Sequence, residues 1–496
     1  MSFNRRTLLG GLGGAALGAA LGRRGHARAE TSTRPRLLIV LTGTGGASII
    51  DGPLAIRASE SRAADTLNVF PDAEVSQPEG SPLRAVDHRG ESVGSIPAPF
   101  SADQSSFVRK YHREMLVVTG TGTSVNHQIG QRRSVTGNEA WSGRTLQELV
   151  ALHYGDGLPL PNVHLATGTA FTERGSDRGL PSWAYGEPVA DPALWPLALD
   201  GKRGLRTPDP ALVERARTLR DERLDPESRF ARVFARSPRL AAWTAQRGEP
   251  QRRIEAAELV DKLMLFPESE RYPLTQFGLR PSPAATRVRE LFPKFETDPL
   301  EAQAALAFLL LKFRVSTTVT LGPGQGLVLD VSGGAQAGLP KDALRNTPIA
   351  FDFAHQAHRS TQAVMWDRLY RIADGLITLL REEEDEGGAS LWDRSLLYCA
   401  TEFGRTRGRP AGAAEFGSGH DLNNGSLIVS PLVQGDRILG GVDPDTGMTY
   451  GYDPVSGAPD RGREMPEATL FAGLLQAMGI ETPASLPSVP AIRGRA

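Results

Sequence analysis

The chain has 496 residues, and its 56 Lys and Arg against 57 Asp and Glu leave a formal net charge of −1. The charges are scattered along the sequence, with no basic stripe interleaved with aromatic residues, which excludes nucleic-acid binding as the expected function. The length suits one large α/β domain with insertions, or two domains.

The amino terminus predicts export. An Arg-Arg pair at positions 5 and 6 precedes a weakly apolar, glycine-rich run over residues 8–22, and an Ala-Arg-Ala sequence ends at residue 29. These features are typical of a twin-arginine signal peptide, which we assign to residues 1–29; a chance arginine pair is the alternative. The apolar run is too short for a permanent membrane span. We therefore expect the twin-arginine export machinery to deliver a folded, periplasmic or secreted protein without a stable span in its mature form.

The first strand of the mature chain leads into a glycine-rich loop. The strand is predicted over residues 36–41, of which 37–41 are apolar; it continues into the glycine-rich turn 42–48, which is followed by Asp51. The glycine spacing matches neither the dinucleotide fingerprint nor the lysine-bearing phosphate loop. We interpret the glycines as room for the backbone to approach a site, with Asp51 as a candidate metal ligand. The alternative is that Asp51 only begins an Asp-Gly-Pro turn.

A second buried strand precedes a helix that begins with two polar residues. Residues 115–119 are apolar, and Asn126 and His127 fall at the amino end of a helix that stops at Gly137. The partial positive charge at a helix amino terminus favours an anion or an anionic intermediate. Asn126 and His127 are therefore the candidate catalytic residues.

The middle of the chain is predicted to be helical. Residues 211–236 and 252–265 are charged and amphipathic, with Glu and Arg at helical spacing, so residues 200–300 are predicted to form a helical insertion or cap. The apolar helix predicted over 302–313 is followed by a strand over 315–321.

A carboxylate and two imidazoles occur together before a long helix. Asp352, His355 and His358 lie within a few residues of one another, and a helix is predicted over 363–384. Asp352 and His355 are candidate metal ligands. His358 either orients a ligand or lies on the surface.

The most informative stretch is near the carboxyl terminus. The short apolar run 396–400 is typical of a buried parallel strand, and Glu402 follows at its carboxyl end, where open α/β sheets place their ligands. A turn-rich loop then presents His420 just before a second apolar run, 426–429. Glu402 pairing with Arg405 or Arg407 instead, with His420 as an ordinary loop residue, is the alternative.

The alternation of strands and helices predicts a mainly parallel sheet with helices on both faces. Residues from several strand ends would then meet at one rim of the sheet and share a divalent metal ion. Their mixture of carboxylates and imidazoles suits zinc, manganese or calcium equally. The predicted ligands are Asp51, Asp352, His355, Glu402 and His420.

The order of these motifs resembles an exported bacterial family of unknown function within the sulfatase/alkaline-phosphatase superfamily. The resemblance is carried by the loop 45–51, by the Asn-His pair before Thr136-Gly137, by the Asp-His element at 352–355, by Glu-Phe-Gly-Arg-Thr at 402–406 and by Gly-His-Asp at 419–421. It implies a single alkaline-phosphatase-like α/β domain over residues 30–496. It also implies a metal-dependent hydrolase that acts on a small anionic substrate, a phosphate or sulfate ester.

Two departures from that superfamily's pattern bear on the chemistry. His127 stands where a sulfatase carries its nucleophile, and Glu402-Phe403 replaces a strand-end Asp-His pair. The resemblance therefore leaves a second hypothesis, a non-catalytic periplasmic binding or assembly protein on the same fold. His127 could be a ligand, a base or an unusual nucleophile.

Overall fold

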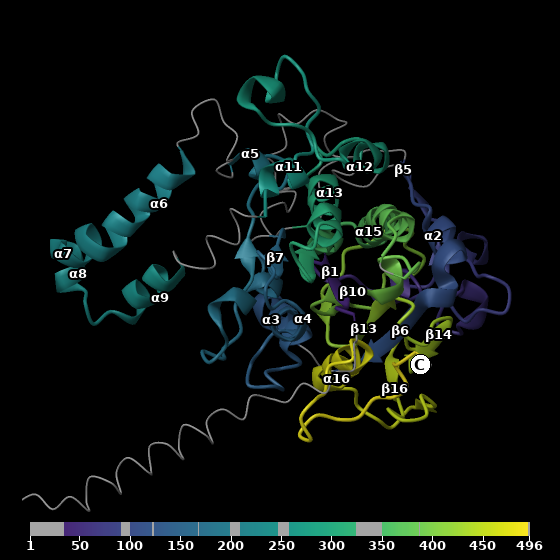
Figure 1. The fold of residues 1–496 in the computed structure, drawn as a ribbon. Coiled ribbons are helices and arrows are strands. Elements are labelled where there is room, and N and C mark those ends of the chain that lie inside the picture. The colour runs from purple at the N-terminus through teal and green to yellow at the C-terminus, as the bar shows by residue number, and fades with distance from the viewer. Residues whose placement is uncertain are drawn as a thin grey trace, which may run out of the picture. The chain divides into compact units, whose positions relative to one another are not determined.

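A sheet of eight strands forms the centre of this computed structural model (Figure 1). The structure describes residues 34–90, 100–121, 124–166, 168–198, 209–246, 257–323, 350–385 and 387–494. The strands of the sheet are β1 (Leu37–Gly43), β6 (Met115–Gly120), β7 (Asn162–His164), β8 (Glu187–Pro188), β9 (Thr318–Leu321), β10 (Ser395–Thr401), β13 (Asn424–Val429) and β14 (Arg437–Leu439).

The strand order is β14-β6-β13-β10-β1-β9-β7-β8. β13 runs antiparallel to both of its neighbours, β10 and β6, and the other five pairings are parallel. The sheet is therefore mixed and mostly parallel, which is compatible with an α/β fold. β1 and β10 are paired along their whole lengths at its centre, from Leu37 with Ser395 to Gly43 with Thr401.

Helices cover both faces of this sheet (Figure 1). One face packs against α2 (Gln104–Tyr111), α13 (Pro299–Lys312) and α15 (His358–Glu382), and the other against α3 (His127–Thr136), α4 (Leu146–Tyr154) and α16 (Glu467–Ala477). Alternate residues of β1 enter the two cores: Ile39 and Leu41 join the first, and Leu38 and Val40 the second. Burial on both faces explains why the central strands are continuous apolar runs in the sequence.

The remaining elements are short. The region 195–291 contains α5 (Trp195–Ala198), α6 (Pro210–Leu219), a π-helical turn (Arg220–Leu224), α7 (Asp225–Glu227), α8 (Arg229–Val233), α9 (Pro238–Gln246), α11 (Leu259–Leu263) and α12 (Ala285–Leu291). The small sheets are β2 (Val75–Ser76) with β3 (Ala85–Val86), β4 (Arg89–Gly90) with β5 (Phe100–Ser101), β11 (Gly404–Arg405) with β12 (His420–Asp421), and β15 (Gly441–Val442) with β16 (Thr449–Tyr452) and β17 (Pro459–Asp460). Two 3-10 helices, η1 (Ile49–Asp51) and η10 (Phe351–His355), carry predicted site residues.

The described residues from Arg36 onward belong to one compact unit. The predicted signal peptide, residues 1–29, lies outside the described residues. Helices are present in the predicted block 200–300, and its role as an insertion or cap stays a prediction. Among the described residues, no helix combines the length and the apolar character needed to cross a membrane.

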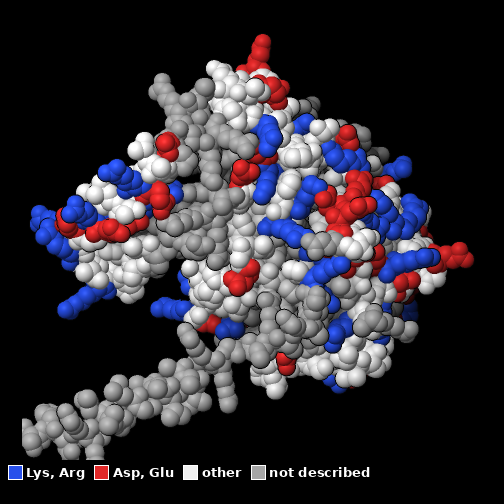
Figure 2. Space-filling view, in the orientation of Figure 1, with Lys and Arg blue, Asp and Glu red and all other residues white. Residues whose placement is uncertain are grey.

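Acidic and basic side chains are intermixed over the face shown in Figure 2. The surface ion pairs of the chain include Arg287 with Glu382 at 2.6 Å and Lys110 with Asp374, also at 2.6 Å. Exposed pairs of this kind contribute little stability individually. The mixture agrees with the near-zero net charge of the chain.

The buried His164, at the end of β7, should make the fold sensitive to acid. It is 5 % exposed, and burial lowers its pKa from 6.5 to about 4. Between these pH values only the unfolded chain takes up the proton, so stability is complete above pH 6.5 and falls as the pH drops, by up to roughly 3 kcal/mol. His164→Gln should flatten the dependence of the urea-unfolding midpoint on pH within this window only. A variant that keeps the wild-type slope there would contradict this role of His164.

Candidate metal centre

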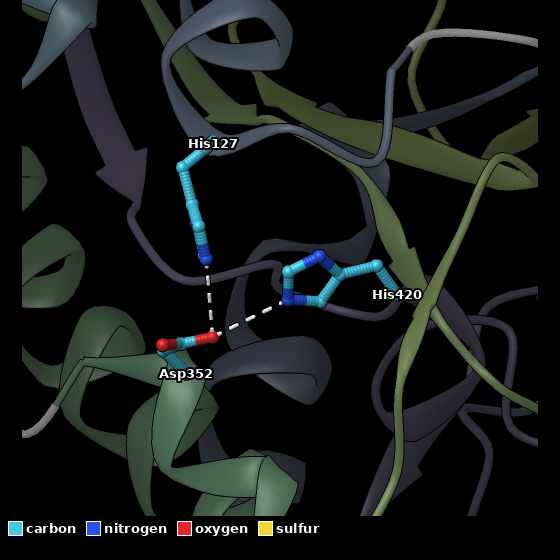
Figure 3. Close-up of side chains that lie close together, drawn as sticks. All are labelled: His127, Asp352 and His420. Atoms are coloured by element: carbon cyan, nitrogen blue, oxygen red, sulfur yellow. Dashed lines mark ion pairs between the residues drawn. The ribbon is translucent and has the colours of Figure 1, made fainter.

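Three side chains from distant parts of the sequence converge beyond the ends of the central strands. His127 is the first residue of α3, Asp352 lies in η10, and His420 lies in β12. One ligand atom from each lies within 4.8 Å of the others. Figure 3 shows both imidazoles pointing toward the Asp352 carboxylate. The group could therefore hold a metal ion.

The spacing of the atoms suits ligands of one ion. Asp352 Oδ1 lies 3.4 Å from His127 Nε2 and 3.5 Å from His420 Nε2. His355 adds a third imidazole, with its Nε2 3.2 Å from Asp352 Oδ1 and 2.9 Å from His420 Nε2. Ligand atoms bound at about 2.0–2.1 Å around a tetrahedral ion are separated by about 3.3 Å. His355 therefore lies beside the group of three and contacts two of its members.

Glu402 holds His127 in position. Its side chain is fully buried, and Oε1 accepts hydrogen bonds from His127 Nδ1 at 2.8 Å and from the Gly45 amide at 2.6 Å. Because Nδ1 donates to Glu402, Nε2 is directed toward Asp352. Hydrogen bonds to Asp352 and to Glu402 raise the pKa of His127 to about 9, so a metal ion must displace a proton from Nε2.

Arg405 holds Asp352 in position. The buried guanidinium donates to Asp352 Oδ1 at 2.9 Å, to the Phe351 carbonyl at 3.3 Å and to the Gly45 carbonyl. Burial alone would raise the pKa of Asp352, but hydrogen bonds from His127, His420 and Arg405 outweigh it and hold that pKa well below its usual range. The sequence suggested Arg405 only as a partner of Glu402. No sequence signal identifies Asp352, 53 positions away, as its partner.

The glycine loop after β1 fits between these groups. Gly45 has φ +95°, and a Cβ there would lie 2.2 Å from the Asp352 amide nitrogen. Gly46 has φ +85°, and its Cβ would lie 2.5 Å from the Phe403 ring. Any larger residue would have to move the backbone that carries Asp352. The glycines thus provide the close backbone approach that the sequence indicated.

Asp51 lies in a separate buried network. Its carboxylate oxygens are both 3.1 Å from His358 Nε2, and Oδ1 also accepts from Asn68 Nδ2 at 2.9 Å. His358 Nδ1 lies 2.7 Å from Ser418 Oγ. Burial raises the pKa of Asp51, but His358 and the other hydrogen-bond donors lower it below its usual value.

This network joins three segments of the chain, and none of its residues belongs to the group formed by His127, Asp352 and His420. His358 is fully buried, so the alternative that it lies on the surface is wrong. It links the start of α15 to the η1 turn and to Ser418, two residues before His420. The structure therefore places Asp51 outside the group that could hold an ion.

The other predicted residues have identifiable partners. Asn126 is the N-cap of α3, and its side chain accepts from the Ile129 amide at 3.1 Å. Glu402 contacts His127 directly and is not part of the group of three. Arg407 donates to Asp421 at 2.7 Å, so it is occupied in holding the β11–β12 hairpin.

The close fit of Gly45 can be tested with a matched glycine. Gly80 also has positive φ, +74°, but a Cβ there would meet nothing within 4 Å, so Gly80→Ala should cost only about 1 kcal/mol of backbone strain. Gly45→Ala should lower the thermal midpoint further and weaken zinc binding at least about tenfold, because Asp352 must move. Zinc affinity is measured by competition with a chelator. Equal behaviour of the two variants would contradict the close fit.

Glu402 should control metal affinity through His127. Glu402→Gln removes the charge that accepts from His127 Nδ1 and from the Gly45 amide, so zinc affinity should fall roughly 10–100-fold. The control is Asp445→Asn, which removes a carboxylate from an exposed pair with Arg62. Unchanged zinc affinity in Glu402→Gln would show that Glu402 does not orient the imidazole.

No protein-family model, curated protein or solved structure matches the chain. What the site can do therefore follows from its own geometry. That geometry brings two imidazoles and a carboxylate, His127, His420 and Asp352, into a group that could hold a metal ion.

Proposed function

We propose that this chain is an exported, metal-dependent hydrolase of phosphate or sulfate esters, built on an alkaline-phosphatase/sulfatase-like fold. The observation that carries the proposal is the convergence of His127, Asp352 and His420, with His355 beside them. The mostly parallel sheet, with helices on both faces and the group beyond its strand ends, supports the same fold. The twin-arginine pattern of residues 1–29 supports export.

Each side chain has a distinct task in this proposal. His127, Asp352 and His420 would hold a divalent ion, with His355 completing the set, and a ligand set dominated by imidazole favours zinc over calcium. Glu402 keeps His127 Nε2 directed at the ion site through the bond to Nδ1. Arg405 keeps the Asp352 carboxylate ionised and fixed.

A water molecule is the preferred nucleophile. Bound there, a divalent ion would polarise the ester and make water a better nucleophile at neutral pH. No cysteine belongs to the group of described residues that could hold an ion. Ser124 accepts a hydrogen bond from the Asn126 amide at 3.1 Å, which occupies it in the turn before α3.

One observation favours a non-catalytic binding or assembly protein instead. The Arg405 guanidinium is 0 % exposed and is already engaged by Asp352 and by backbone carbonyls. Its terminal nitrogens therefore cannot bind the anionic group of a substrate without losing these contacts. In this second function the chain would use the same cleft for binding or assembly, with or without an ion, and would catalyse no reaction.

Hydrolysis and metal content together test the proposal. The purified protein loaded with zinc should hydrolyse 4-nitrophenyl phosphate or 4-nitrophenyl sulfate, and a chelator should abolish the activity. His420→Gln should lower kcat/KM by about 100-fold or more and lower bound zinc, because it removes one ligand atom. Asp445→Asn is the matched surface control. No bound ion together with no hydrolysis of either ester would contradict the hydrolase function and favour the non-catalytic one.

A further inference from the structure

The segment 209–246 concentrates exposed apolar side chains. It comprises α6, the π-helical turn, α7, α8 and α9, teal elements that follow one another in Figure 1. None of its side chains that the structure describes is buried. Fourteen large apolar side chains are exposed among the described residues, and six of them lie in this segment, where they are 46–67 % exposed: Leu212, Leu219, Leu224, Phe230, Val233 and Phe234.

The spacing of these side chains places them on helix faces. Leu212 and Leu219 are seven positions apart in α6, and Phe230 and Val233 are three positions apart in α8. Phe234 is the C-cap of α8, and its ring lies 4.9 Å from that of Phe230 between centroids. A helix in a protein takes most of its stability from the packing of its apolar face. Because these faces are exposed within the chain, they are suited to contact another molecule.

The charges of the segment are divided unequally between its two halves. Residues 209–227, the acidic half, carry six carboxylates against four arginines, and residues 228–246, the basic half, carry four arginines and no carboxylate. Among the described residues, no ion pair involves Arg229, Arg232 or Arg236 of the basic half. The acidic half of a second copy offers the complementary charge.

We propose that residues 209–246 form the surface through which two copies of this chain associate. In a twofold arrangement, the acidic half of each copy lies against the basic half of the other, and the apolar faces cover each other. Anionic lipid is another partner for exposed apolar and basic side chains, but it would repel the six carboxylates of the acidic half. The charge pattern therefore favours a second copy, and this inference does not depend on the proposed hydrolase function.

Sedimentation equilibrium of the mature protein tests the association. The wild type should form dimers with a dissociation constant on the order of 1 μM or below. Phe234→Ser should raise this constant at least about tenfold, because it removes a large apolar side chain from the contact. The matched control is Phe277→Ser. Phe277 is 47 % exposed, as Phe234 is, but it lies outside the segment in the 3-10 helix η8 (Leu274–Phe277), so its loss should leave the dimer unchanged.

Two results of this measurement would overturn the inference. One is a wild type that remains monomeric at about 100 μM, roughly a hundred times the expected dissociation constant. The other is equal self-association of folded Phe234→Ser and Phe277→Ser. Thermal unfolding midpoints establish that each variant is folded.

Charge reversal tests the pairing of the two halves. A first variant, Glu222→Arg with Glu227→Arg, makes both halves basic. A second variant, Arg229→Glu with Arg232→Glu and Arg236→Glu, makes both halves acidic. Each variant alone should dissociate at least about tenfold more readily, because like charges then face each other. An equimolar mixture should recover dimers with one copy of each variant, and a mixture that stays as dissociated as its components would overturn the proposed arrangement.

Lipid vesicles distinguish the other partner. The dimer should sediment with neither phosphatidylglycerol nor phosphatidylcholine vesicles, because its apolar faces are covered. Binding of a monomeric wild type to phosphatidylglycerol vesicles alone, lost in Phe234→Ser, would overturn the inference in favour of an anionic lipid surface. None of these experiments measures ester hydrolysis, so their outcome is separate from that of the proposed function.

Discussion

The rest of the site depends on the hydrogen bonds made by the backbone of Gly45. Its amide donates to Glu402, its carbonyl accepts from Arg405, and its α-carbon lies so close to Asp352 that no side chain fits between them. Glu402 in turn orients His127, and Arg405 orients Asp352. A single glycine after the central strand β1 thus fixes the two sides of the candidate metal centre relative to each other. Only glycine combines the positive φ with this close approach.

The same arrangement explains the balance of charge at the site. Two carboxylates, Glu402 and Asp352, face a buried guanidinium and an imidazole whose pKa is raised. Buried charges of this kind are tolerated only when they are paired and hydrogen-bonded. The side chains that would bind an ion are therefore held in place before any ion arrives, and preorganised ligands bind more tightly than mobile ones. Since Arg405 is used for this purpose, it is not free to recognise the anionic group of a substrate, which is the main structural argument for a non-catalytic function.

The sequence predicts the main strands and helices of the fold because local residue patterns determine them. The apolar runs that became β1, β6 and β10 end at glycine or acidic residues, and α3 begins at Asn126 and stops at Gly137. The sequence also predicted that Asp352, His355 and His420 share one site, and the structure brings them close together. The sequence did not predict which carboxylates join the candidate metal group and which bind other side chains, because this depends on tertiary hydrogen bonds. Asp51 contacts His358 on α15, and Glu402 accepts a hydrogen bond from His127. The residues of each pair are about 300 positions apart, so no local sequence pattern indicates these contacts.

We infer that side chains from α3, η10 and β12 bind one metal ion. Anomalous X-ray diffraction from crystals of the zinc-loaded protein, collected on both sides of the zinc absorption edge, tests it most directly. The account predicts a single strong anomalous peak within bonding distance of His127 Nε2, Asp352 and His420 Nε2, with His355 beside it. A peak at the pair Asp51 and His358, or no peak at a zinc concentration that saturates binding, would contradict it.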